Sequence, residues 1–263
     1  MRIACSSLAF SQRPFEDACH RIARLGFRYV DVAVMQGWAH FDASDLVERF
    51  DEELERAQKA LERAGLTPVA LNASAGTSEV GPESERFAAI CRFARALRAP
   101  VICYVAPLAV VGMERAVRRY ERLRDIAQEH GVLLAVEAHA RTMLEIPELA
   151  VEFCERLESV YLTLDPSHMY AGENQGAPYE ILFPYVRHTH WRDAGTDWSQ
   201  AQVNVGEGVV DFEYALRGLR AAGYEGAYSV EYIDTFPNGG VQNIQAMKTL
   251  LEELLVEIAQ EEF

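Results

Sequence analysis

The phrase QEHGVLLAVEA (residues 128–138) contains the pattern that decides the fold: the end of a polar helix, a glycine and a short apolar run. The same order recurs as ARLGFRYVDVAV (23–34), ERAGLTPVAL (62–71) and RAAGYEGAYSVEY (220–232). The glycines Gly26, Gly65, Gly131 and Gly223 stand where a helix needs a left-handed residue to end and turn the chain back. The repeated phrase therefore predicts helices and strands in alternation.

The segments before the glycines are amphipathic, whereas the runs after them are continuously apolar, which is typical of parallel strands buried on both faces. We predict eight strands, at residues 2–6, 29–34, 67–73, 101–105, 133–137, 161–165, 186–190 and 228–231. Eight strand–helix units in this length predict an α/β fold, a single-domain (β/α)₈ barrel over residues 1–263. A doubly wound open sheet is the main alternative, but no G-x-G-x-x-G follows a strand and the units are too many.

The composition narrows the class of protein. The chain has 263 residues, of which 49% are apolar and 25% charged, as in globular proteins. No apolar run reaches the ~18 residues of a membrane span, and the first residues, MRIACSSLAF, do not have the pattern of a signal peptide. A net charge of −15 disfavours nucleic acid and anionic membranes as partners. Five dispersed cysteines without a CxxC motif indicate a reduced, cytoplasmic protein.

Four consecutive predicted strands end on residues that bind metals. These are Glu137 in AVEAHA, Asp165 in LTLDPSH, His190 in RHTHWRD and Glu231 in YSVEY. Each alone is more often an ordinary solvated strand-end residue, but strand carboxyl ends converge on the active-site face of a barrel. Three carboxylates in one small space repel each other, and a divalent cation removes that repulsion. An oxygen-rich set with one imidazole suits Mn²⁺, Mg²⁺ or Co²⁺, and Zn²⁺ is also compatible.

The sequence resembles the xylose-isomerase-like TIM barrels, a family of sugar phosphate isomerases and epimerases that is related to endonuclease IV. The resemblance covers essentially the whole chain and rests on VEAH (136–139), DPSH (165–168), HTHWRD (188–193), NVGEGVVDF (204–212) and GYEGAYSVEY (223–232). It implies that Glu137, Asp165, His190 and Glu231 bind one divalent metal ion. It also implies that Glu137 and Glu231 are the catalytic acid and base, and that His168 contacts the substrate.

The chemistry agrees with the resemblance. A metal ion at these residues would polarise a sugar carbonyl and stabilise the enediolate that forms when a neighbouring carbon loses its proton. We therefore expect a metal-dependent isomerase or epimerase of sugars or sugar phosphates. In the ketose 3-epimerases of the family, an arginine and a glutamate occupy the positions that are Thr196 and Met143 here. These two differences leave the identity of the sugar open.

Four further residues are candidates for substrate binding. His168 lies three residues beyond the aspartate ligand, where a tight turn can point it at the pocket, although a surface role fits as well. Arg192 can bind a substrate oxygen or neutralise the acidic cluster, and His139 can orient a ligand or hold a loop. Trp38 can form an apolar wall for a sugar ring or pack within its loop.

Three other functions are compatible with parts of the pattern. An inosose-type dehydratase would use the same metal and base but eliminate water. A DNA-repair enzyme like endonuclease IV would need further histidines, which the predicted third and fourth strands (VALNAS, VICYVAP) lack. A non-catalytic sugar-binding protein would not need both Glu137 and Glu231. Assembly into a homodimer or homotetramer is left open by the sequence.

Overall fold

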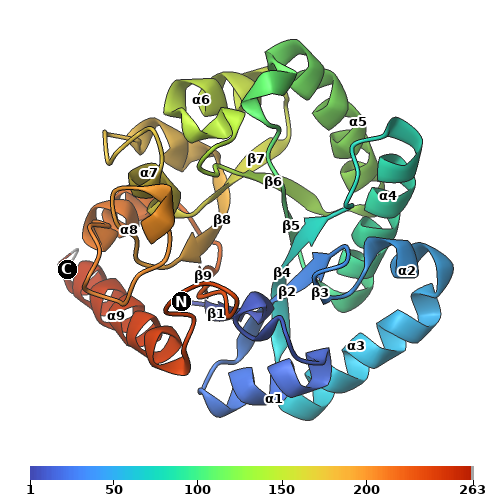
Figure 1. Cartoon of the computed structure of the whole chain (residues 1–263), viewed down its shortest axis with the longest axis horizontal. Helices are drawn as coiled ribbons and strands as arrows, with labels where there is room; N and C mark the ends of the chain where they lie inside the picture. The colour runs from blue at the N-terminus through green and yellow to red at the C-terminus, as the bar shows by residue number, and fades with distance from the viewer. Residues whose placement is uncertain (262–263) are drawn as a thin grey trace.

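The glycines of the repeated phrase end helices as predicted. Gly65 and Gly131 are left-handed, with φ of 64° and 68°, and their backbone N–H groups donate to carbonyls of the preceding helical turn. A side chain would be strained at these angles, so glycine is the residue that ends these helices at low cost. The computed structural model, which describes residues 1–261, shows the resulting ring of strands surrounded by helices (Figure 1).

Eight parallel strands form a closed barrel, which confirms the predicted fold. β1 pairs with β2 on one side and with β9 on the other, so the sheet has no break. Each strand end lies within one residue of its prediction. The strands are β1 (Ile3–Ser6), β2 (Tyr29–Met35), β4 (Thr67–Ser74), β5 (Val101–Tyr104), β6 (Leu133–Glu137), β7 (Val160–Leu164), β8 (Val186–Trp191) and β9 (Tyr228–Val230).

One short strand was not predicted. β3 (Ala39–His40) pairs antiparallel with the end of β2, with Val34 opposite His40. The chain reverses through Gly37, whose φ is 72°. A pairing of two residues leaves no period in the sequence, so pattern analysis treats it as part of the loop. The hairpin places Trp38 beside the carboxyl end of the barrel.

Helices cover the outside of the barrel, and the core lies between them and the strands. On the first helix, Phe15, Ala18 and Ile22 are fully buried against the strands, as their spacing predicts. The helices are α1 (Phe15–Arg24), α2 (Ala43–Glu48), α3 (Phe50–Ala64), α4 (Val80–Leu97), α5 (Met113–His130), α6 (Pro147–Arg156), α7 (Pro166–Ala171), α8 (Phe212–Ala221) and α9 (Val241–Gln260).

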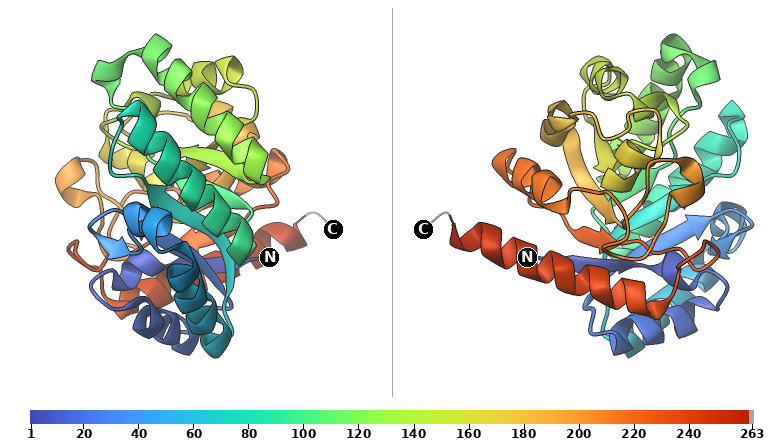
Figure 2. Two further views of the ribbon diagram at one scale, coloured as in Figure 1. Left: turned by 90° about the vertical axis from the view of Figure 1, so that its right-hand side faces the viewer. Right: turned by 60° about the vertical axis from the view of Figure 1, so that its left-hand side comes forward.

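The last helix covers the seam where the barrel closes. α9 contacts β1, β9 and α8, and Figure 2 shows it running beside the first strand. Short 3₁₀ helices occupy the loops: η1 (Ser7–Phe10), η2 (Ala109–Val111), η3 (Met143–Glu145), η4 (Glu180–Tyr185) and η5 (Trp198–Gln200). Among residues 1–261, no helix has the length and apolar character needed to cross a membrane.

Candidate metal centre and active site

The four predicted metal ligands meet at the carboxyl end of the barrel. Glu137 is the last residue of β6, His190 lies near the end of β8, and Asp165 and Glu231 directly follow β7 and β9. These strands are neighbours in the sheet. Carboxylate oxygens of Glu137, Asp165 and Glu231 all lie within 4.8 Å of one another. The Nδ1 atom of His190 lies 3.0 Å from Glu137 Oε1 and 3.5 Å from Glu231 Oε2.

The sequence DPSH forms a tight turn that orients Asp165. Its Oδ1 atom accepts a hydrogen bond of 2.9 Å from the backbone N–H of Ser167, and Pro166 begins α7. An aspartate before a proline is a common way to start a helix. The other oxygen, Oδ2, is buried, accepts no hydrogen bond from residues 1–261, and lies 3.2 Å from Nε of Arg192. One oxygen therefore stabilises the turn, and the other is available to a cation.

Burial and charge displace the pKa values of these groups in different directions. Burial, together with repulsion from Glu137 and Asp165, raises the pKa of Glu231. Burial also raises the pKa of Asp165. Burial acts in the same direction on Glu137, but the hydrogen bond and charge of His190 outweigh it and lower the pKa of Glu137. Burial acts to lower the pKa of His190, but the surrounding carboxylates outweigh it and raise this pKa well above its usual value.

These residues fit a divalent cation. Three buried carboxylates and one imidazole nitrogen form the oxygen-rich donor set that Mn²⁺, Mg²⁺ or Co²⁺ prefers. Asp165 Oδ2, which is buried and accepts no hydrogen bond within the described part of the chain, is the kind of atom that an ion would satisfy. A cation would also offset the repulsion that raises the pKa of Glu231.

A cavity of about 320 Å³ opens onto this cluster. Its apolar lining residues are Leu8, Met35, Trp38, Val105, Trp198, Ile233 and Phe236. Its polar lining residues are Gln36, Asn72, Ser74, Glu137, His139, His168, Arg192 and Glu231. All four residues that the sequence suggested for substrate binding therefore line the same cavity as the two glutamates.

His168 and Arg192 form a buried pair in the cavity wall. Arg192 Nη2 donates to His168 Nε2 at 3.0 Å, so the proton of the neutral imidazole is on Nδ1. Burial lowers the pKa of His168 well below its usual value, which keeps the ring neutral. Arg192 Nη1 and His168 Nδ1 are both buried donors without a hydrogen-bond partner in the described part of the chain.

His139 and Trp198 extend this wall. The ring centroids of His139 and His168 are 3.8 Å apart, and the indole of Trp198 stacks on His168 at 5.9 Å with an angle of 16°. Nδ1 of His139 donates to the Ala140 carbonyl at 2.6 Å, which fixes the ring. Trp198 was not predicted as a cavity residue, because it lies in an irregular segment beyond β8 where the sequence shows no periodicity.

Two residues missed in the sequence hold Glu231. Asn72 Nδ2 donates to Glu231 Oε1 at 2.9 Å, and Ser6 Oγ donates to the same oxygen at 3.3 Å. Both lie at the carboxyl ends of strands, β4 and β1. Their position in the barrel was predictable, but their residue types are common in ordinary turns.

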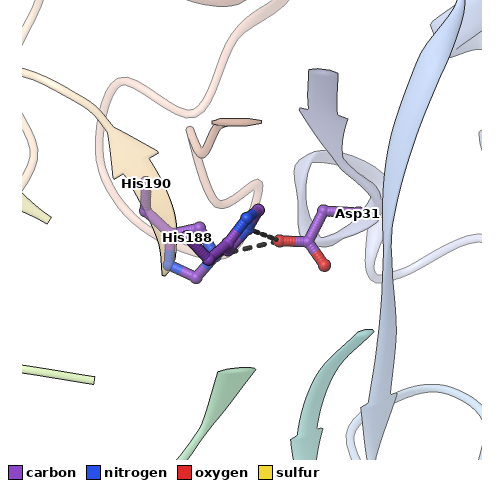
Figure 3. A group of neighbouring side chains, drawn as sticks. All are labelled: Asp31, His188 and His190. Atoms are coloured by element: carbon purple, nitrogen blue, oxygen red, sulfur yellow. Dashed lines mark hydrogen bonds and ion pairs between the residues drawn. The ribbon is translucent and has the colours of Figure 1, made fainter. Parts of the chain in front are cut away.

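A further layer lies beneath the four ligands. Asp31, in the middle of β2, accepts hydrogen bonds of 2.9 Å from Nε2 of His188 and from Nε2 of His190 on one oxygen, Oδ2 (Figure 3). Burial acts to raise the pKa of Asp31, but the attraction and hydrogen bonds of the two histidines outweigh it and lower that pKa. Two features of the sequence could have indicated this layer. One is the acidic residue within the apolar run YVDVAVM, and the other is the pair of histidines two residues apart in HTH.

Comparisons with known proteins agree with the fold. The family model described as xylose isomerase-like TIM barrel matches residues 19–253. A search of curated proteins finds no match. A solved D-tagatose 3-epimerase-like protein is 16% identical, with a TM-score of 0.79 and coverage of 100% of both chains.

Two more solved structures have similar folds. A xylose isomerase-like TIM barrel protein from Mycobacterium smegmatis, crystallised with magnesium, is 16% identical, with a TM-score of 0.78 and coverage of 98% of this chain and 97% of the other. The probable 3-DHS dehydratase AsbF from Bacillus anthracis is 15% identical, with a TM-score of 0.73 and coverage of 96% and 99%. Similarities at this level establish the fold. With the family match over most of its length, the chain belongs to the xylose isomerase-like TIM barrel family.

Proposed function

We propose that this protein is a divalent-cation-dependent sugar isomerase or epimerase that moves a proton at a carbon next to a carbonyl. One observation carries the proposal. Two glutamates on strands that are not adjacent, Glu137 and Glu231, face one buried ligand cluster, and their surroundings displace their pKa values in opposite directions. A pair of carboxylates with separated pKa values is typical of acid–base catalysis. The similar fold of an epimerase-like protein supports this reading.

The ligand set Glu137, Asp165, His190 and Glu231 would hold the ion. When bound, the ion would polarise the sugar carbonyl and stabilise negative charge that develops on it. One of the two glutamates, Glu137 or Glu231, accepts the proton from the substrate carbon, and the other glutamate returns a proton. Return to the opposite face gives an epimer, whereas return to the neighbouring carbon gives an aldose–ketose conversion.

The cavity wall would position the sugar. Arg192 Nη1 and His168 Nδ1 donate no hydrogen bond to any described residue, and we assign them to substrate hydroxyl or carbonyl oxygens. Trp38 and Trp198 provide apolar walls for the C–H faces of the ring. His139 fixes the orientation of His168 through ring contact.

We further propose that the substrate is not phosphorylated. Arg192 is the one guanidinium among the residues that line the cavity, and its Nε already faces Asp165 at 3.2 Å. Two ionisable carboxyl groups, those of Glu137 and Glu231, line the same cavity. A phosphate in this cavity would add negative charge beside these carboxylates, and the charge of Arg192, the guanidinium that could balance it, is already shared with Asp165.

The test is a panel of free ketoses and aldoses, each beside its phosphate ester, incubated with Mn²⁺-loaded protein in D₂O. NMR should show deuterium entering the carbon next to the carbonyl of a free sugar. Glu137→Gln and Glu231→Gln should reduce this exchange by about 10²- to 10⁴-fold. The control is Glu207→Gln, since Glu207 is exposed and does not line the cavity.

The outcomes separate the candidate functions. Exchange with free sugars but not with their phosphate esters supports both proposals. Faster exchange with the phosphate esters contradicts the proposal that the substrate is not phosphorylated, but not the proposed isomerase or epimerase function. Loss of one water from the substrate, seen as a mass change, would favour a dehydratase. The probable 3-DHS dehydratase AsbF has a fold similar to that of this chain. No exchange with any member of the panel would contradict the proposed function.

A further inference from the structure

The cluster of Asp31, His188 and His190 lies inside the barrel, below the proposed cation site. Asp31 comes from β2 and the two histidines come from β8, and these strands are not neighbours in the sheet, so the contact crosses the barrel interior (Figure 3). All three side chains are buried, with at most 1% of their surface exposed. Residues two apart on a strand point to the same face, which is why His188 and His190 reach one carboxylate together.

The two nitrogens of His190 face different partners. Nδ1 lies 3.0 Å from Glu137 Oε1, on the side of the proposed cation. Nε2 lies 2.9 Å from Asp31 Oδ2, on the side of the barrel interior. An ionised carboxylate only accepts hydrogen bonds, so the nitrogen that faces Asp31 must carry a proton. Nδ1 faces Glu137 in the same way and carries a proton while no ion is bound. A cation that displaces this proton would bind the lone pair of Nδ1, and the ring would keep its proton on Nε2.

We infer that Asp31 is a positioning residue that selects the tautomer and orientation of His190, with Nδ1 toward the cation. This inference rests on the proposed function, because it assumes that His190 is a metal ligand. His188 approaches the same Asp31 oxygen at 2.9 Å and so holds the carboxylate in place from a second direction. Carboxylates that accept the second N–H of a metal-binding histidine commonly contribute 10- to 100-fold to metal affinity.

Calorimetry tests the inference through metal affinity rather than turnover. Asp31→Ala should weaken Mn²⁺ binding by roughly 100-fold, because no acceptor remains for His190. Asp31→Asn keeps an acceptor oxygen but loses the negative charge, and we expect a smaller loss of about 10-fold. This second variant keeps the shape of the side chain if Asp31→Ala does not fold.

The matched control is Ser229→Ala. Ser229 is fully buried, pairs in register with His190 across β8 and β9, and its hydroxyl has no hydrogen-bond partner among the described residues. The substitution therefore changes the barrel interior beside His190 without removing a hydrogen bond of the ring. Its Mn²⁺ affinity should equal that of the wild type.

A second measurement reports the tautomer itself. In wild-type protein loaded with diamagnetic Mg²⁺, long-range ¹H–¹⁵N NMR should show the His190 proton on Nε2. A proton on Nδ1, or unchanged Mn²⁺ affinity in both Asp31 variants, would overturn the inference. Failure of the wild type to bind any divalent ion would instead contradict the proposed function, so the two failures are distinguishable.

Discussion

Removing one carboxylate from the candidate metal centre should stabilise the protein when no divalent ion is present. The substitution is Glu231→Gln, measured in EDTA. Gln keeps the oxygen that accepts hydrogen bonds from Asn72 and Ser6. Its new amide group would lie beside the carboxylates of Glu137 and Asp165, which have oxygens within 4.8 Å of the Glu231 carboxylate. The variant thus loses the repulsion between carboxylates and keeps these two hydrogen bonds.

The size of the effect follows from the pKa of Glu231. Burial and the neighbouring carboxylates raise it from 4.5 to about 7. At 1.36 kcal/mol per pKa unit, the ionised form is disfavoured by about 3 kcal/mol. A gain of this size in the free energy of unfolding would raise the Tm by roughly 5–10 °C in a protein of this length.

The sign of the pH dependence is fixed by the same shift. A carboxyl group whose pKa is raised on folding does not reduce stability below the unfolded pKa, where it is protonated in both states. Its penalty grows as the pH rises from about 4.5 through about 7. Wild type and Glu231→Gln should therefore have similar stability at pH 5, and the variant should be more stable at pH 8.

Thermal and urea denaturation in EDTA at the two pH values provide the assay. Added Mn²⁺ should largely cancel the advantage of the variant, because an ion at 100 times its Kd stabilises the wild type by about 2.7 kcal/mol and the variant binds it more weakly. Glu207→Gln, at an exposed site, should behave like the wild type under all conditions. The reasoning is refuted if Glu231→Gln is no more stable than the wild type at pH 8 in EDTA.

Three further predictions concern other parts of the molecule. The thiols of the native protein should not react with Ellman's reagent at pH 8, because they are buried and burial raises their pKa values; they are Cys5, Cys19, Cys91, Cys103 and Cys154. A thiol that reacts rapidly in the native protein would contradict this prediction. Glu83→Ala should lower the free energy of unfolding by about 3–5 kcal/mol in urea without changing Mn²⁺ affinity, because buried Glu83 binds Arg119 and Arg122. Trp198→Ala should raise the KM for the sugar by roughly 5- to 30-fold, for a loss of about 1–2 kcal/mol of apolar contact, and an unchanged KM would remove Trp198 from the binding wall.

The fold and the positions of the ligands were predictable because both follow from chain periodicity. Each helix–glycine–strand phrase specifies one unit, and eight parallel units close into a barrel whose strand ends must converge. Glu137 and Glu231 could therefore be predicted to lie together at one end of the barrel, although they are 94 positions apart in the sequence. Their metal-binding and catalytic roles stay predictions.

The supporting residues could not be predicted in the same way. Asp31 contacts His190 across the barrel interior, and no local period encodes which residue of one strand meets which residue of a distant one. Asn72 and Trp198 take their positions from loop and strand-end geometry, where residue type alone is a weak signal. The pairing of Arg192 with His168 depends on the turn at Asp165, which brings α7 back over the cavity.

The central claim is that four strand-end side chains bind one divalent ion, and anomalous diffraction from crystals soaked in Mn²⁺ tests it most directly. We expect a single anomalous peak per chain, in contact with Glu137, Asp165, His190 and Glu231 at the mouth of the cavity. A peak at Asp31 and His188 instead, or no peak among the four side chains at saturating Mn²⁺, would contradict the account.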